Sequence, residues 1–192
     1  MKRFLGQRII GLMVLALVAL SFVQIAIAEE AKNITIGVSV GDLGLERWKR
    51  DMDYMVARAK ELGANVYAVS ADGDEQKQIA DVENMLTKGI DVLIALPTNS
   101  KTLAPAVEAA HADNIKVIAY DRIIENADLD YYITFDMLGV GKLQAQYLLD
   151  RMPKGRYFLL AGPKTDNNAL LFREGQMMVL QSYIDKGDVV VV

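Results

Sequence analysis

The sequence contains no cysteine among its 192 residues. This absence excludes a disulfide framework, a thiol nucleophile and a cysteine-ligated metal, and it also excludes lipid attachment at an N-terminal cysteine. Histidine occurs only once, as His111, near the polar end of a predicted helix, where a surface position is expected. With a single histidine and no cysteine, a transition-metal site is not expected. We therefore expect neither a metal nor another cofactor.

Basic residues are too few and too scattered for a nucleic-acid partner. The chain has 21 Lys and Arg against 25 Asp and Glu, and its net charge is −4. Neutralisation of phosphates by basic side chains supplies most of the affinity for nucleic acids. The nucleotide-binding glycine motifs are absent as well, because Gly37, Gly41 and Gly44 do not have G-x-G-x-x-G spacing and no P-loop pattern occurs.

Residues 1–28 have the features of a secretory signal peptide. A basic start with three Lys or Arg precedes an apolar run at 9–23, and Ala26–Ala28 has the small-x-small pattern of a cleavage site. The alternative is a retained membrane anchor, but the run is shorter than the roughly 20 residues of a spanning helix. We therefore expect cleavage, export and a free protein in the periplasm.

Apolar stretches of strand length alternate with helical patterns between residues 34 and 120. Strands are predicted at 34–40, 66–69, 91–95 and 116–120, and three helices fill the intervals between them. Glycines end the first two helices at Gly63 and Gly89. Three successive strand–helix–strand units predict an α/β fold, an open parallel sheet with helices on both faces.

The alternation starts again after residue 130. Further strands are predicted at 131–135, 157–161 and 189–192, with helices at 137–151 and 169–183. We expect a signal peptide at 1–28, a first, incomplete α/β lobe at 29–130 and the start of a second, truncated α/β lobe at 131–192. About 60 residues cannot easily cover both faces of a sheet. A single long sheet through both parts is the alternative.

Polar side chains follow the predicted strands at their carboxyl ends, where open parallel sheets bind ligands. Carboxylates accept hydrogen bonds, a guanidinium donates several in a planar fork, and an amide does both. These groups suit the hydroxyls of a small neutral sugar, and an aromatic ring suits its C–H face. The candidate ligand-binding residues are Arg47, Trp48, Asp121, Arg122, Asp166 and Asn168.

Three segments carry a resemblance to a known family: Asp42–Trp48, Ala119–Arg122 and Thr165–Gln176. They resemble the periplasmic D-xylose-binding proteins of ABC sugar importers, and the likeness runs from about Lys32 to the last residue. The resemblance implies two α/β lobes that close over a sugar and present it to a membrane permease. It assigns the first four candidates to the first lobe, and Asp166 and Asn168 to the second.

The sequence also departs from that family. Phe135–Gly139 is more apolar than the family's stretch there, and the remaining second-lobe ligands and hinge returns have no counterpart. We therefore expect the chain to be the N-terminal half of such a protein. The preference for a pentose, D-xylose above all, rests on the resemblance alone.

Several candidates also have a purely structural interpretation. Trp48 fits the apolar stripe of its helix, so it could belong to the core, and Asp166 could cap a helix. Arg122 could pair with Asp121 or with a surface acid.

Two other functions remain open beside transport. A sugar-sensing protein could pass its bound form to a membrane receptor. A carbohydrate-active enzyme would use a pair of carboxylates such as Asp121 and Asp166. Neighbouring arginines, however, keep carboxylates ionised, which suits hydroxyl binding better than proton donation. We therefore expect no enzymatic activity.

Overall fold

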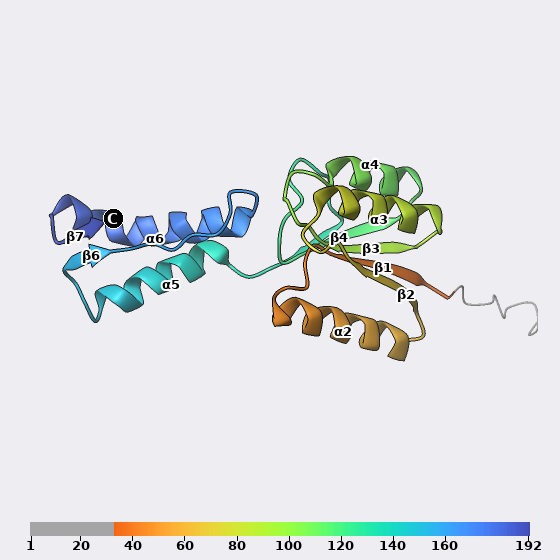
Figure 1. Cartoon of the computed structure of the whole chain (residues 1–192), viewed down its shortest axis with the longest axis horizontal. Coiled ribbons are helices and arrows are strands. Elements are labelled where there is room, and N and C mark those ends of the chain that lie inside the picture. Colours follow the sequence, from red (N-terminus) through yellow and green to blue (C-terminus); the bar gives the residue numbers. More distant parts are fainter. Residues whose placement is uncertain (1–32) are drawn as a thin grey trace, which may run out of the picture. The chain divides into compact units, whose positions relative to one another are not determined.

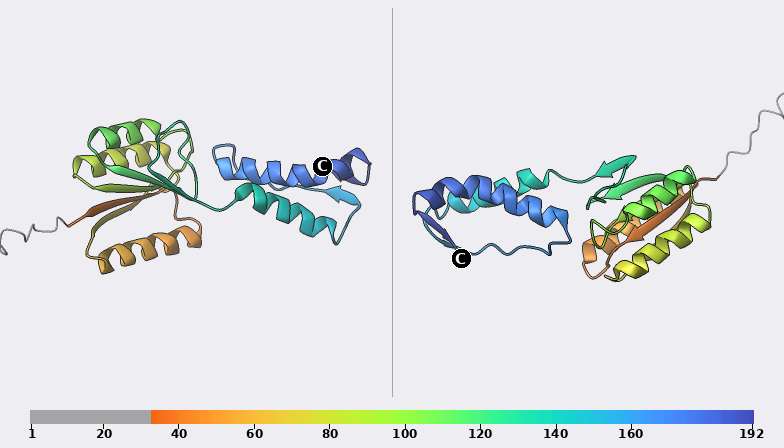
Figure 2. Two further views of the ribbon diagram at one scale, coloured as in Figure 1. Left: turned by 180° about the vertical axis from the view of Figure 1, so that it is seen from behind. Right: turned by 90° about the horizontal axis from the view of Figure 1, so that it is seen from above.

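The computed structural model describes residues 33–192 (Figures 1 and 2). The predicted signal peptide lies outside the described residues. Within residues 33–192, no helix combines the length and the apolar character that a membrane span requires.

The first part of the chain forms a fully parallel sheet, as the sequence predicted, but the sheet has five strands and not four. The strand predicted at 131–135, which was expected to begin the second lobe, joins this sheet as its edge strand. The strand order of the sheet is β2-β1-β3-β4-β5. In chain order the elements are β1 (Thr35–Val40), α2 (Glu46–Glu61), β2 (Asn65–Ser70), α3 (Glu75–Thr87), β3 (Val92–Leu96), α4 (Ala104–Ala112), β4 (Lys116–Tyr120) and β5 (Tyr131–Ile133).

Helices cover both faces of this sheet, which confirms the predicted class. Figure 1 shows α2 on one face and α3 with α4 on the other. On the α2 side, Trp48 packs with Val38, while Leu93 and Val107 are buried on the opposite side. Each fully buried side chain of this size stabilises the fold by about 1.5–3 kcal/mol. The alternation of inward side chains along β1 and β3 therefore places a core on each face.

Helix boundaries follow the local signals in the sequence. Gly63 and Gly89 adopt left-handed backbone angles (φ +84° and +73°) just after α2 and α3, a conformation that glycine adopts at little cost. Asp74 caps α3 by accepting hydrogen bonds from the backbone N–H groups of Gln76 and Lys77.

The second part consists of α5 (Met137–Leu149), β6 (Gly155–Tyr157), α6 (Asn167–Asp185) and β7 (Val189–Val191). β6 and β7 form a two-stranded parallel sheet. The two helices pack side by side (Figure 2), and a small core joins them to the sheet. Its buried members are Ala145, Leu149, Tyr157, Leu180 and Val189.

The strand predicted at 157–161 is placed wrongly. The observed strand ends at Tyr157, because β7 supplies partners only for Gly155–Tyr157. Residues 158–163 have no regular structure, and Phe158 and Leu160 are exposed. The strand predicted at 131–135 is also shorter, and its first three residues pair with β4. The lobe boundary after residue 130 stays a prediction.

Helices α5 and α6 approach each other through two glycines. Gly141 lies against the backbone of Phe172, and Gly175 lies against the backbone of Leu138. A Cβ atom at either glycine would overlap a carbonyl oxygen of the facing helix. The two backbones therefore touch directly at this crossing, with no side chain between them.

Asp130 anchors the start of β5. Its carboxylate accepts hydrogen bonds from Lys116 Nζ (2.7 Å) and the Val117 backbone N–H (2.8 Å), and it lies 2.9 Å from His111 Nε2. The hydrogen bond from Lys116, followed by those from Val117 and His111, holds the pKa of Asp130 well below its usual range. His111 thus has a structural role, because it contacts Asp130 at the amino end of the sheet.

The lowered pKa of Asp130 predicts a pH dependence of stability. A carboxyl whose folded-state pKa is depressed stabilises the fold above its unfolded pKa of about 3.9, and this contribution is lost as the pH falls below that value. Asp130→Asn removes the charge that accepts these hydrogen bonds and should lower the free energy of unfolding at pH 7 by about 1–2 kcal/mol. The effect is not larger because Lys116 is exposed and solvent screens its charge. Urea unfolding between pH 3 and 7 measures this effect. If the variant lost stability between pH 7 and pH 3 as steeply as the wild type, Asp130 would not be the source of this pH dependence.

Candidate functional site

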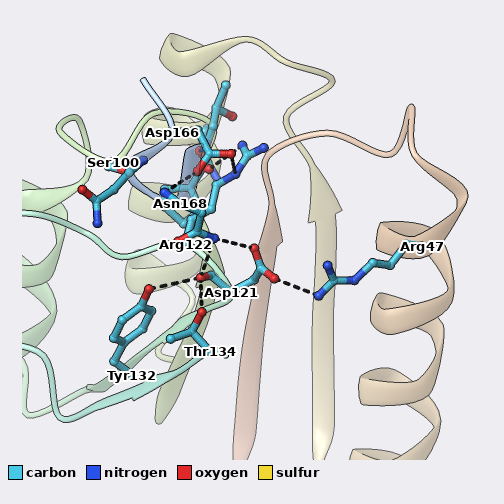
Figure 3. Close-up of polar contacts among 12 residues, drawn as sticks. Arg47, Ser100, Asp121, Arg122, Tyr132, Thr134, Asp166 and Asn168 are labelled. Carbon is cyan, nitrogen blue, oxygen red and sulfur yellow. Dashed lines mark hydrogen bonds and ion pairs between the residues drawn. The ribbon is translucent and has the colours of Figure 1, made fainter. Parts of the chain in front are cut away.

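A polar cluster lies at the carboxyl end of β4 (Figure 3). Asp121 directly follows the strand and is 5% exposed. Its backbone has a left-handed φ of 59°, which is uncommon for a residue with a side chain. Its N–H donates to Ile133 O at 2.8 Å, so the residue is fixed against β5.

The Asp121 carboxylate receives hydrogen bonds from two directions. Arg47 Nη2, in the first turn of α2, donates to Oδ2 at 2.8 Å. Asn168 Nδ2, in the first turn of α6, donates to Oδ1 at 3.0 Å. Partial burial by itself would lower the pKa of Arg47. The contact with Asp121 outweighs this effect and raises the pKa, so Arg47 stays protonated. An anion and a cation therefore face each other here.

Arg122 and Asp166 form a second ionic contact. Arg122 Nε lies 3.0 Å from Asp166 Oδ2, and both side chains are mostly buried. The other oxygen of Asp166 accepts a hydrogen bond from the Asn168 backbone N–H at 2.9 Å and so caps α6. Asp166 thus has both the capping role and a place in the cluster.

Among the residues that the structure describes, two buried side-chain polar atoms lack a hydrogen-bond partner, and both belong to this cluster. They are Arg122 Nε, whose ion pair is not aligned as a hydrogen bond, and Asn168 Oδ1. Leaving such a group unpaired costs about 1–3 kcal/mol. One is a donor and the other an acceptor, which matches the needs of a hydroxyl group.

The structure thus brings five of the six predicted residues together and places the sixth beneath them. Trp48 is 6% exposed and packs in the core with Val38 and Leu96. The Arg47 guanidinium lies over its ring, 4.3 Å from the centroid. This geometry gives Trp48 a supporting role for Arg47, and direct stacking on a ligand stays a prediction.

A small pocket opens beside Asp121. Its volume is about 170 Å³, and its walls are mainly apolar. Tyr120, Ile133 and Phe135 supply these walls, while Arg47 and Asp121 supply charge. An apolar wall next to a charged pair suits a ligand with both C–H and hydroxyl faces.

Sequence reasoning missed several residues that shape the site. Ser100, 1% exposed, donates its backbone N–H to Thr165 O at 3.0 Å and thereby connects the β3–α4 loop to the segment before α6. Gln78 is fully buried and links the ends of β1 and β3 through Ser39 and Leu96. A buried glutamine in an apolar helical face was the one signal available for Gln78.

Tyr132 and Thr134 were missed as well. Both hydroxyls donate to the backbone carbonyl of Asp121. They stand two positions apart, so they share one side of an extended segment. That alternation of hydroxyls was visible in the sequence, but nothing in it identified Asp121 O as their acceptor.

No group of three or more His, Asp or Glu side chains in residues 33–192 is arranged to hold a metal ion. The polar atoms at the site are instead two carboxylates, two guanidinium groups and one amide. Such a set can bind hydroxyls through both donors and acceptors.

The parallel sheet carries a mixed donor and acceptor cluster at its carboxyl edge, which is the edge where open α/β sheets bind ligands. Comparison with known proteins gives the family. A periplasmic binding protein domain matches residues 36–192, and the chain belongs to this family.

Named relatives agree with this family. The D-xylose-binding periplasmic protein of Escherichia coli (strain K12) is 49% identical over 166 residues, which cover 86% of this chain and 50% of that protein. The multiple sugar-binding periplasmic receptor ChvE of Rhizobium radiobacter is 38% identical over 87% of this chain and 49% of that protein. The chain therefore spans about half the length of these relatives.

A solved structure supports the fold independently. An ABC transporter solute-binding protein from Clostridium phytofermentans, with bound β-D-glucose, superposes with a TM-score of 0.78 at 34% identity. The match covers 82% of this chain and 51% of that chain. The resemblance inferred from sequence is thus confirmed for family and fold.

Proposed function

We propose that this protein captures a pentose, D-xylose above all, in the periplasm and delivers it to the membrane permease of an ABC importer. The observation that carries the proposal is the cluster of Asp121, Arg122, Asp166 and Asn168, with a buried donor and a buried acceptor left unpaired. The 49% identity to a D-xylose-binding protein supports the choice of sugar.

The proposed mechanism uses the two unpaired atoms. Asn168 Oδ1 can accept a hydrogen bond from a sugar hydroxyl, and Arg122 Nε can donate one, once the contacts that bury these two atoms open. Because Asn168 lies in α6 and Asp166 caps it, while Asp121 and Arg122 follow β4, a sugar bound to this cluster contacts both parts of the chain. Such a ligand favours the closed arrangement by its differential affinity. A sugar that cannot satisfy these buried groups is rejected.

We propose no enzymatic role. A glycosidase needs one carboxylic acid that can donate a proton. Here the Asp121 carboxylate is hydrogen-bonded to Arg47, and the Asp166 carboxylate lies against Arg122. Each carboxylate thus already faces a guanidinium group, an arrangement suited to accepting hydrogen bonds and not to donating a proton.

Ligand-dependent melting tests the sugar. The full-length gene product should be stabilised by about 2.7 kcal/mol at a D-xylose concentration 100 times the dissociation constant. That corresponds to a rise in melting temperature of roughly 5–10 °C. D-ribose, L-arabinose and D-glucose at the same concentration serve as comparisons. Equal melting temperatures with all four sugars would contradict a sugar-specific site.

A sensory role is the second candidate, because one relative is named a periplasmic receptor. Deleting the gene distinguishes the two roles. Loss of growth on low concentrations of D-xylose supports transport, whereas normal uptake with a lost transcriptional or chemotactic response to xylose supports sensing.

A further inference from the structure

Asp121 has an unfavourable backbone conformation that its neighbours must maintain. Its φ of 59° lies in the left-handed region, where a Cβ atom crowds the backbone. Residues with side chains remain in that region only where the surrounding structure fixes them. The conformation matters for the site, because it sets the direction in which the Asp121 carboxylate leaves the end of β4.

Three side-chain donors converge on the backbone carbonyl of Asp121 (Figure 3). Thr134 Oγ1 donates at 2.8 Å, Asn168 Nδ2 at 3.1 Å and Tyr132 Oη at 3.2 Å. A carbonyl oxygen has two lone pairs, so three donors saturate it. Two of the three come from the β5 segment, which contributes no candidate ligand of its own.

We propose that Tyr132 and Thr134 are positioning residues, which hold the Asp121 backbone so that its carboxylate meets Arg47 and Asn168. This inference rests on the proposed function, since it concerns the geometry of the same site. Thr134 lines the pocket beside Asp121 and Tyr132 does not, so a direct contact with the sugar would involve Thr134 alone, whereas positioning involves both hydroxyls. Both act through the carbonyl of Asp121, and together they fix the peptide plane that joins Asp121 to Arg122.

The two hydroxyls are suited to this task. Tyr132 is partly buried, and this burial raises the pKa of its phenol. The nearby charges of Asp121 and Asp166 raise the pKa further, while the contact with Thr134 acts in the opposite direction without cancelling the rise. The phenol therefore stays a proton donor at neutral pH. Thr134 directly follows the last paired residue of β5, and its hydroxyl donates to Asp121 O at 2.8 Å.

Hydroxyl deletion tests the proposal. Thr134→Val should weaken binding of the sugar that the wild type binds by roughly three- to tenfold, the usual effect of one neutral hydrogen bond. Tyr132→Phe should have a smaller effect, because its hydrogen bond is longer. The double variant should lose more than the product of the two, since Asn168 alone would then remain. Thr134→Ser should restore binding to within about twofold of the wild type, because it keeps the hydroxyl donor.

Matched controls separate positioning from general loss of stability. Thr87→Val removes a hydroxyl that donates to Glu83 O on α3, and Tyr54→Phe removes an exposed phenol on α2. Both controls should bind sugar like the wild type. Melting temperatures of all ligand-free variants are compared, and weaker binding that merely follows a lower melting temperature, without rescue by serine, would overturn the proposal.

A second measurement does not depend on any sugar. Backbone NMR chemical shifts report the φ of Asp121 in the ligand-free full-length gene product. The double variant should move Asp121 out of the left-handed region, and Thr134→Ser should not. An Asp121 that keeps its φ in the double variant overturns the inference, whatever the affinity. A moved φ with unchanged affinity overturns it as well.

Sugar affinity and the φ of Asp121 together distinguish a failure of this inference from a failure of the proposed sugar-binding function. A wild type that binds none of the sugars contradicts the proposed function, whereas the φ of Asp121 still decides whether Tyr132 and Thr134 hold it.

Discussion

Gly175→Ala is expected to lower the free energy of unfolding by about 3 kcal/mol or more. Alanine normally favours a helix over glycine by about 1 kcal/mol, so the expected sign is opposite to that of intrinsic propensity. The reason is the crossing of α5 and α6, where a Cβ at Gly175 would overlap Leu138 O. The overlap is with backbone, which cannot rotate away. Urea unfolding followed by circular dichroism measures the loss.

Glu174→Ala is the matched control for this change. It introduces the same residue one position earlier on α6, at an exposed site, and should alter stability by less than about 0.5 kcal/mol. Gly141→Ala should repeat the effect of Gly175→Ala, because its Cβ would overlap Phe172 O on the other helix. If both glycine variants were as stable as Glu174→Ala, the helices would not cross as closely as described.

Asp121→Ala is expected to reduce sugar affinity by roughly 100-fold or more, because hydrogen bonds to a charged group contribute about 1.5–3 kcal/mol each. The change removes the acceptor of both Arg47 and Asn168. It leaves a partly buried guanidinium without its 2.8 Å partner. Isothermal titration with D-xylose measures the affinity of wild type and variant.

Asp53→Ala provides the control for Asp121→Ala. Asp53 forms an exposed ion pair with Lys49 on α2 and makes no ion pair with a residue of the cluster. Exposed pairs of this kind contribute about 0–1 kcal/mol to stability and nothing to a distant site. Wild-type affinity is expected for Asp53→Ala. Retention of full affinity by Asp121→Ala would remove Asp121 from the site.

The sequence predicted the first four strands well, because β1, β3 and β4 contain buried apolar residues and the helices α2 and α3 end at glycines such as Gly63. The second part was harder. The apolar run at 157–161 has the composition of a strand, but strand length depends on the partner, and β7 offers only three residues. Such a pairing limit is a tertiary property, and local composition does not encode it.

The sequence predicted which residues form the candidate site but not how their backbone is held. Asp121 and Asn168 were named from their positions after predicted strands, and the structure joins them at 3.0 Å. The left-handed backbone of Asp121 and the roles of Tyr132 and Thr134 were not predicted. They depend on which carbonyl a hydroxyl reaches in three dimensions. A serine or threonine on a strand edge has many possible acceptors, and sequence does not choose among them.

The direct contact between the backbones of α5 and α6 has a mechanical consequence. Side chains between two helices can change rotamer and let the helices slide, but at Gly141 and Gly175 there is none to change. The two helices are therefore expected to move as one stiff body. Deformation between that body and the first sheet then concentrates in Thr134–Asp136, the short link between β5 and α5. A displacement of this link is therefore expected to reach the carbonyl of Asp121, which accepts a hydrogen bond from Thr134.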